Sequence, residues 1–525
     1  MFYVIGSGPA GIACAQALVR AGRDVTILDP GMELEEDRRR SIAQLQGADS
    51  ANWTRQSTAF LREGISSGKA GIPLKLAYGS DFPYRESRGA TVIRCDGVES
   101  KPSYARGGLS AVWGAAMLPY RQADIEDWPI TVKDLEPGYR AVLEWMPLAG
   151  RADDLSEMFP LYSDCPAQLP MSRQASGMLA DVERNREKLK AKGLRWGCSR
   201  LAVDANGAAA SSPCVECGLC MYGCPHGLIY SSDLTLAALL STKRVQYRSG
   251  LTVQKIEENA GEVEIHAINS DGRPEVLRGE RAFVGAGVLN TTAILLRSLG
   301  LYDHPVAMRD SQYFLMPLLR LRGTRNVVRE PLYTLAQLFV EIFDQAISPY
   351  TVHLQTYTYN DLFRQPLEAA LGPLKAVFPI ETFLGRLMLF QGYLHSKQST
   401  TIKATLVRTS EGDALQLHAE PNAETKKQVR KIAGKLTGLA FLSGVLPLAP
   451  LIQIGQPGRG FHTGGSFCMS RQPKLGETDI LGRPYGLERV HAIDASVLPT
   501  IPATTITYTV MANAYRIGTQ SAALD

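Results

Sequence analysis

Residues 2–11, FYVIGSGPAG, decide the fold of this chain. The apolar first half predicts a buried parallel strand, and a helix of small and apolar residues is expected over Ile12–Arg20. Between them, Gly6 permits a tight turn, Gly8 lets the backbone approach a pyrophosphate, and Gly11 allows close helix–strand contact. The free N–H groups at the start of this helix favour phosphate binding.

A second strand is expected over Asp24–Leu28, and Asp29 follows it, 23 residues after Gly6. A carboxylate near this spacing accepts hydrogen bonds from a ribose hydroxyl in dinucleotide-binding folds. Strand, glycine turn, helix, strand and acid occur in the expected order, which favours a dinucleotide site over a chance loop. We therefore predict an α/β fold class (α+β overall) built on a Rossmann-like domain.

The composition agrees with a soluble globular protein of two to four structural units, since 45% of the 525 residues are hydrophobic and 21% are charged. The net charge of +4 is spread along the chain, so no nucleic-acid partner is expected. The sequence shows no signal peptide before the first strand, so a cytoplasmic location is expected. The apolar stretch 436–454 contains two prolines, which argues against a transmembrane segment; a buried helix and loop is expected, with peripheral membrane contact or partner docking as the alternative.

Several further segments share one resemblance. They are RGGLSAVWG (106–114), DWPI (127–130) with LEP (135–137), FVGAGV (283–288) with Thr291-Thr292, VHAIDASVLP (490–499), and the closing stretch 502–518. In this order they resemble the glucose–methanol–choline (GMC) oxidoreductases, and residues 4–29 resemble the start of an FAD-binding domain of glutathione-reductase type. Some bacterial members, FAD-linked sugar or alcohol dehydrogenases with a cysteine-rich iron–sulfur loop, are similar to this chain. Only residues from about 310 to 455 carry no family motif.

The resemblance implies a dissociable FAD, because residues 106–114 contain no His or Cys for a covalent flavin bond. The cofactor-binding residues that it implies are Gly6, Gly8, Pro9, Ala10, Gly11, Asp29, Gly107, Gly108, Ser110, Trp113, Gly114, Val253, Gly285, Ala286, Gly287, Asp494, Ala495, Thr504 and Thr505.

The family's catalytic histidine is matched by His462 in FHTGGS (461–466). Alcohol oxidation needs a base for the hydroxyl proton while flavin N5 receives the hydride, and an imidazole is suited to that role. Many relatives carry a second His or Asn in the closing loop, where this chain has Thr505. A hydroxyl can donate and accept hydrogen bonds but is no base at neutral pH, so Thr505 is expected to assist only by hydrogen bonding, with His462 acting alone or with His395.

Four cysteines, Cys214, Cys217, Cys220 and Cys224, lie within eleven residues, and Pro225 follows them. This spacing is that of ferredoxin clusters, although in two-cluster ferredoxins the fourth cysteine serves the other cluster. We expect an iron–sulfur cluster, [4Fe–4S] before [3Fe–4S]. A structural zinc and an empty site are the alternatives, and zinc is disfavoured because its cysteine pairs are usually well separated in sequence.

The expected domains are a first FAD-binding part (1–155), an insert with the cysteine loop (156–235), a second FAD-binding part (236–309), an antiparallel-sheet substrate domain (310–455) and a C-terminal active-site segment (456–525). In the substrate domain, strands are expected at 314–321, 350–359, 401–408 and 414–418, and helices near 331–346 and 363–391. The apolar residues of this domain are interpreted as core, with an entrance for a bulky or lipid-linked alcohol as the alternative.

The predicted enzyme is an FAD-dependent dehydrogenase of CH–OH groups, with a sugar-like or polyhydroxylated substrate expected by family analogy. A small-molecule or glycan- or lipid-linked alcohol would be the substrate, and an electron-acceptor protein is a candidate partner of the cluster. Three alternatives stay open. They are an oxygen-using alcohol oxidase with a structural metal, a lyase on the same fold, and a flavin and iron–sulfur electron-transfer subunit without an alcohol substrate.

Overall fold

A five-stranded parallel sheet forms the base of the nucleotide-binding half of the molecule. The computed structural model describes residues 1–64, 74–164, 166–208, 212–259, 261–364, 368, 372 and 380–524. The strand order is β20 (Val490–Ala492), β9 (Arg281–Val284), β1 (Phe2–Ile5), β2 (Val25–Leu28) and β5 (Val245–Arg248). All four neighbouring pairs are parallel. The α/β class is confirmed, and both strands expected around the first glycine turn are present.

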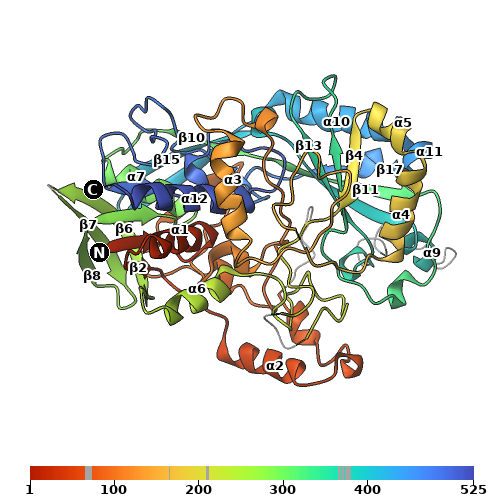
Figure 1. Cartoon of the computed structure of the whole chain (residues 1–525), viewed down its shortest axis with the longest axis horizontal. Helices are drawn as coiled ribbons and strands as arrows, with labels where there is room; N and C mark the ends of the chain where they lie inside the picture. The colour runs from red at the N-terminus through yellow and green to blue at the C-terminus, as the bar shows by residue number, and fades with distance from the viewer. Residues whose placement is uncertain are drawn as a thin grey trace.

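Helices pack closely around this sheet (Figure 1). They are α1 (Pro9–Arg20), α3 (Val132–Val142), α6 (Ser232–Ser241), α7 (Val288–Ser298) and α12 (Thr507–Ser521). A Cβ on Gly138 would lie 2.3 Å from the carbonyl oxygen of Ala512, so only glycine allows α3 to cross α12 at this distance. An antiparallel sheet of β6 (Leu251–Asn259), β7 (Glu262–Asn269) and β8 (Pro274–Gly279) extends from the edge of this half.

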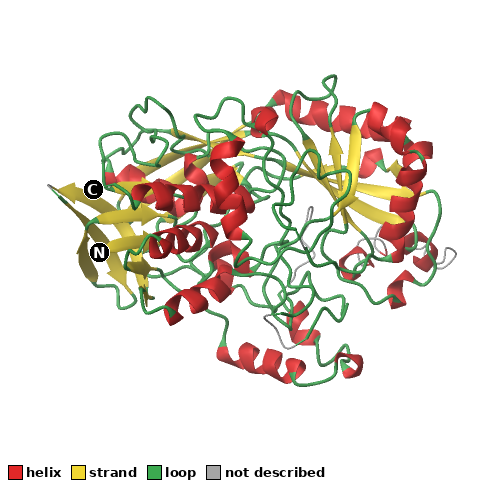
Figure 2. Cartoon of the chain, in the orientation of Figure 1, coloured by secondary structure: helices red, strands yellow, loops and turns green. Residues whose placement is uncertain are grey.

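Of two further sheets, the larger forms the other half of the molecule and the smaller lies beside the nucleotide-binding half, and loops fill much of the centre (Figure 2). The larger has the order β17 (Val445–Pro447), β11 (Tyr313–Arg320), β14 (Leu387–Tyr393), β13 (Val352–Tyr357), β12 (Leu338–Ile342) and β4 (Leu194–Cys198), with β18 (Gln453–Ile454) also paired to β11. The smaller has the order β19 (Thr463–Gly464), β10 (Val306–Asp310), β15 (Thr401–Thr409), β16 (Gly412–Glu420) and β3 (Val92–Asp96). The helices along the outer side of the larger sheet are α4 (Arg173–Arg184), α5 (Arg186–Ala191), α9 (Ile380–Leu384), α10 (Ala423–Gly438) and α11 (Ala440–Ser443) (Figure 1).

The four strands expected between 310 and 455 are present, but the helix expected near 331–346 is wrong. That stretch contains β12, whose five residues are all buried. A strand covered on both faces has no alternation of apolar and polar residues, so its pattern resembles that of a buried helix. Within the stretch 363–391, where a helix was expected, the described residues contain α9 and then β14, and most of 365–379 lies outside the described residues.

Helix α2 (Glu36–Gln46) projects from the lower edge in Figure 1 and begins an arm that runs to residue 64. Leu45 and Leu61 of this arm pack on Leu219 and Tyr222 of the cysteine loop. Across the residues that the structure describes, no helix has the length and apolar character needed to cross a membrane.

Candidate active site

The first glycine turn forms a tight cradle at the carboxyl end of β1. Gly6 has φ +96°, a backbone conformation that favours glycine, and a Cβ on Gly11 would lie 1.9 Å from the Gly6 carbonyl oxygen. Gly8 differs, because its φ is −66° and an added Cβ would meet nothing nearer than the Gly108 Cα at 3.8 Å. Gly6 and Gly11 therefore serve the fold, whereas Gly8 faces open space.

Asp29 lies buried beside this cradle. Its two carboxylate oxygens accept hydrogen bonds from the N–H groups of Ser7, at 2.5 Å, and Gly31, at 2.6 Å. Burial raises its pKa to about 6, against the opposing effect of these N–H groups. Each oxygen keeps a second lone pair, so the carboxylate can still accept a ribose hydroxyl.

A cavity of about 200 Å³ joins the cradle to the C-terminal segment. Most of the expected cofactor residues line it, namely Gly6, Gly8, Pro9, Ala10, Asp29, Gly108, Val253, Gly285, Ala286, Gly287, Asp494 and Ala495. Asp494 is buried and accepts hydrogen bonds from the Thr291 hydroxyl, at 2.5 Å, and the Ser496 N–H, at 3.0 Å. These residues could hold the pyrophosphate and ribose of a dinucleotide.

A second cavity of about 860 Å³ lies next to the first, and Pro9, Leu109, Phe461, Ile506 and Thr507 line both. The remaining expected residues Ser110, Trp113, Gly114, His462 and Thr505 line this larger cavity. Gly11, Gly107 and Thr504 line neither cavity. Gly107 has φ +82° and donates its N–H to the Ser7 hydroxyl. This hydrogen bond stabilises the first glycine turn.

Contacts with neighbouring residues hold His462 in place, and one of its ring nitrogens makes no hydrogen bond. Its ring stacks on that of Tyr393 with centroids 4.6 Å apart, and its carbonyl accepts the Ser311 N–H. Its Nδ1 is buried without a hydrogen-bond partner. Burial, with a smaller effect of His353, lowers its pKa to about 4, so the imidazole is an uncharged base at neutral pH.

Thr505 accepts the Leu118 N–H on its Oγ1 at 2.8 Å, which leaves the hydroxyl proton available to the cavity. The suggestion that His395 assists is wrong. His395 is not among the residues that line the cavity, its Nε2 bonds the Asp124 carbonyl at 3.1 Å, and its Nδ1 accepts the Lys397 N–H at 3.2 Å. Both nitrogens are engaged in local structure because His395 caps a short helical turn.

Sequence reasoning missed a buried pair behind His462. The Nδ1 of His353 lies 2.7 Å from a carboxylate oxygen of Glu341, and both side chains are fully buried. The two residues are direct register partners on β13 and β12. A lone charged residue inside an apolar strand is the signal that could have pointed to them, but the pairing itself requires the sheet register.

The cysteine loop borders the larger cavity. Lys75 lines the cavity, donates to the Trp113 carbonyl at 2.8 Å, and interacts electrostatically with Cys220 and Cys224. The Thr334 N–H points to the Cys220 Sγ at 3.4 Å. Burial raises the pKa of Cys224, and the N–H groups of residues 226, 228 and 229 act in the opposite direction, as donors to its sulfur.

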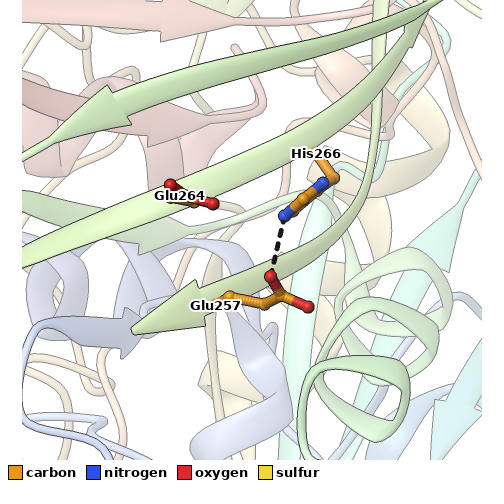
Figure 3. A group of neighbouring side chains, drawn as sticks. All are labelled: Glu257, Glu264 and His266. Carbon is orange, nitrogen blue, oxygen red and sulfur yellow. Dashed lines mark hydrogen bonds and ion pairs between the residues drawn. The ribbon is translucent and has the colours of Figure 1, made fainter. Parts of the chain in front are cut away.

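The four sulfurs do not form a compact single-ion site. Within the described part of the chain, only Glu257, Glu264 and His266 bring three metal-ligating atoms within 4.8 Å of one another (Figure 3). Tetrahedral zinc with Zn–S bonds of about 2.3 Å would need sulfurs about 3.8 Å apart. The loop as it stands is therefore wider than a zinc tetrahedron.

The Glu257–Glu264–His266 group lies on β6 and β7 and is not assigned to a metal. Glu257 pairs with Lys255 at 2.5 Å and with His266 at 3.1 Å, and Glu264 pairs with Arg278 at 2.7 Å. Because each carboxylate already has a cationic partner, an ion would have to displace existing pairs.

Comparison with known proteins agrees with this geometry. Residues 453–514 match a family model described as GMC oxidoreductase, and residues 4–34 match an NAD(P)-binding Rossmann-like domain. The C-terminal segment of the chain thus resembles that of the GMC oxidoreductases. An uncharacterized GMC-type oxidoreductase of Mycobacterium tuberculosis is 22% identical over 553 residues, with 99% of this chain and 75% of that protein covered. The 6'''-hydroxyparomomycin C oxidase of Streptomyces lividus is 23% identical, with 56% of this chain and 49% of that protein covered.

Solved structures of GMC-like fold align over nearly the whole chain. The pyridoxine 4-oxidase of Mesorbium loti gives a TM-score of 0.61 at 15% identity, covering 99% of this chain and 98% of that one. A formate oxidase gives 0.60 at 13% identity, covering 98% and 97%. The resemblance drawn from the sequence motifs is confirmed.

Proposed function

We propose that this protein is a GMC oxidoreductase that binds FAD and oxidises the CH–OH group of an alcohol, with His462 as the base. The observation that carries the proposal is the position of the uncharged His462 imidazole, in the wall of a large cavity that adjoins the dinucleotide cradle. An uncharged imidazole in this position can take the hydroxyl proton.

The residues present fit FAD. Gly8 leaves room where a pyrophosphate would approach, Asp29 keeps lone pairs for a ribose, and Asp494 closes the cavity from the C-terminal side. When bound, FAD supplies the acceptor for the hydride of the alcohol carbon. The chain's own part is to hold the hydroxyl between the His462 imidazole and the Thr505 hydroxyl, and to surround it with buried side chains that exclude water.

Replacing Gly8 with alanine (G8A) is expected to weaken FAD binding about 5- to 150-fold, because crowding a close contact costs about 1–3 kcal/mol. Titration of apo-protein with FAD measures this. The unfolding temperature of the apo-protein should not change, since the new Cβ meets nothing within 3.8 Å. In contrast, G11A should destabilise the apo-protein, because its Cβ would lie 1.9 Å from a carbonyl oxygen. Equal FAD affinity of G8A and wild type would argue against this site for the pyrophosphate.

We further propose that Cys214, Cys217, Cys220 and Cys224 hold an iron–sulfur cluster. Backbone N–H groups that point to the sulfurs support it, as does the ferredoxin-like spacing of the four cysteines. Such a cluster, beside Lys75 and the larger cavity, would carry electrons to an outside acceptor and make the protein a dehydrogenase. The Streptomyces relative and both solved structures described above are oxidases, so an oxygen-using alcohol oxidase with a structural metal is the second candidate.

Several predictions drawn from the sequence remain predictions. They are the domain boundaries, the cytoplasmic location, the electron-acceptor protein, and the lyase and electron-transfer alternatives. The sugar-like substrate also remains a prediction.

The proposed function is tested by mixing FAD-loaded protein anaerobically with alcohols and following the loss of the visible flavin absorption. We expect reduction with a kcat/KM that is constant around neutral pH and falls as pH drops through about 4, where His462 becomes protonated. The value of kcat/KM falls at low pH because the His462 base is active only in its uncharged form, and it stays constant near neutral pH because burial lowers the pKa of this histidine. Failure of every alcohol tested to reduce the flavin would remove the proposal, and a loss of rate near pH 6.5 would mean that His462 is not the buried base.

A further inference from the structure

The floor of the larger cavity is a ladder of paired side chains from β11 and β14. Alternate residues of the two antiparallel strands face the cavity in direct register. The pairs are Tyr313 with Tyr393, Leu315 with Gln391, Pro317 with Leu389, and Leu319 with Leu387. From Tyr393 to Leu387 the floor extends about 20 Å, at roughly 3.4 Å per residue.

The opposite face of β11 explains why these residues are left for the cavity. Phe314, Met316 and Leu318 are fully buried in a hydrophobic cluster that includes residues of α4 and α10. Side chains alternate along a strand, so the residues between them must point the other way. Pro317, Leu319, Leu387 and Leu389 are only half-buried in the middle of a covered sheet because the cavity lies above them.

The floor is polar at one end and apolar at the other. Tyr393 stacks on His462, and Gln391 is the register partner of Gln355 on β13, so the end next to the base carries hydrogen-bonding groups. Beyond Gln391 the floor pairs contain only proline and leucine. The wall beside that end includes Phe383, Leu448 and Leu451. Asn360 also lines the cavity, but its side-chain oxygen already accepts the Leu362 N–H.

This gradient discriminates between two kinds of alcohol. A sugar carries hydroxyls along its whole length, and those beyond Gln391 would meet leucine side chains and lose their hydrogen bonds to water. A hydrocarbon chain needs no partners and gains free energy from each methylene removed from water. The hydroxyl of such a molecule would lie at the polar end, next to His462.

We propose that the substrate is an alcohol group at the end of a long hydrocarbon chain, with the chain lying along the β11–β14 floor. This inference rests on the proposed alcohol oxidation and names the substrate class of the same site.

The test measures kcat/KM for anaerobic reduction of FAD-loaded protein by 1-butanol, 1-octanol, 1-dodecanol and glucose. We expect kcat/KM to rise about fourfold per methylene, which corresponds to about 0.8 kcal/mol for each buried CH₂, until the floor is filled. Glucose should be slower than 1-dodecanol by at least two orders of magnitude.

Replacement of Leu387 with glutamine (L387Q) should lower kcat/KM for 1-dodecanol about tenfold or more and leave that for 1-butanol unchanged, because the short alcohol does not reach it. Leu321→Gln (L321Q) is the matched control, since Leu321 follows the floor residues of β11, is 40% exposed and does not line the cavity. Its kinetics should equal those of wild type.

A kcat/KM that does not depend on chain length, glucose reduction as fast as that of 1-dodecanol, or an equal effect of L387Q on both alcohols would overturn the inference while leaving alcohol oxidation intact. Flavin that no alcohol reduces would instead overturn the proposed function itself, and with it this inference.

Discussion

Replacing His462 with asparagine (H462N) is expected to slow reduction of the bound FAD by alcohol by about 10²–10⁴-fold. Asparagine keeps a polar side chain of similar reach in the cavity wall but offers no base for the hydroxyl proton. Rapid mixing under anaerobic conditions measures the rate. FAD affinity should change little, because the cradle proposed to hold the pyrophosphate and ribose is not lined by His462.

His395→Asn (H395N) is the control for this experiment. His395 is also buried and also stacks on a tyrosine, Tyr350, but it is not among the residues that line the cavity, and both its ring nitrogens bond to the backbone. H395N should lower the unfolding temperature and leave the rate of flavin reduction close to that of wild type. If H462N retains the wild-type rate with bound FAD, another group removes the proton. The rate of H462N should also rise with pH, because solvent base replaces the missing imidazole.

Replacing Cys220 with serine (C220S) is expected to abolish iron binding and the reduction of one-electron acceptors, while reduction of FAD by alcohol continues. Cys220 is chosen because the Thr334 N–H points to its sulfur and because it interacts electrostatically with the other three cysteines. Iron analysis and electron paramagnetic resonance of anaerobically purified protein measure the cluster. A dye that accepts single electrons reports the outward transfer.

Cys95→Ser (C95S) is the matched control, since Cys95 is exposed on β3 and lies outside the cysteine loop. It should keep full iron content and acceptor reduction. C224S separates the two cluster types, because a [3Fe–4S] cluster held by the other three thiolates would survive it. Wild-type protein that contains no iron and is reoxidised rapidly by dioxygen would favour the oxidase alternative.

The nucleotide-binding half was predictable because its signals are local. Gly6, Gly8 and Gly11 act within one turn, and Asp29 follows directly from the second strand. The position of His462 was also predictable, because a motif with flanking glycines carried it. What these glycines could not show is that the imidazole stacks on Tyr393, a residue of another sheet.

The cavity floor was not predictable, because it depends on register between distant strands. Leu319 and Leu387 are 68 residues apart and face the same space only because β11 and β14 pair as they do. From the sequence alone, each leucine is predicted to lie in the hydrophobic core, because leucine side chains are usually buried there. The strand β12 was not predicted for a related reason. Both of its faces are buried, so its sequence lacks the alternation of apolar and polar residues that indicates a strand.

The Glu341–His353 pair has a consequence for how the large sheet assembles. A slip of one residue between β12 and β13 would turn each side chain to the opposite face and bury a carboxylate and an imidazole apart from each other. Misaligned pairings are thereby penalised, and β14, which pairs with β13, inherits the correct alignment. Two residues that do not line the cavity thus help to determine its shape.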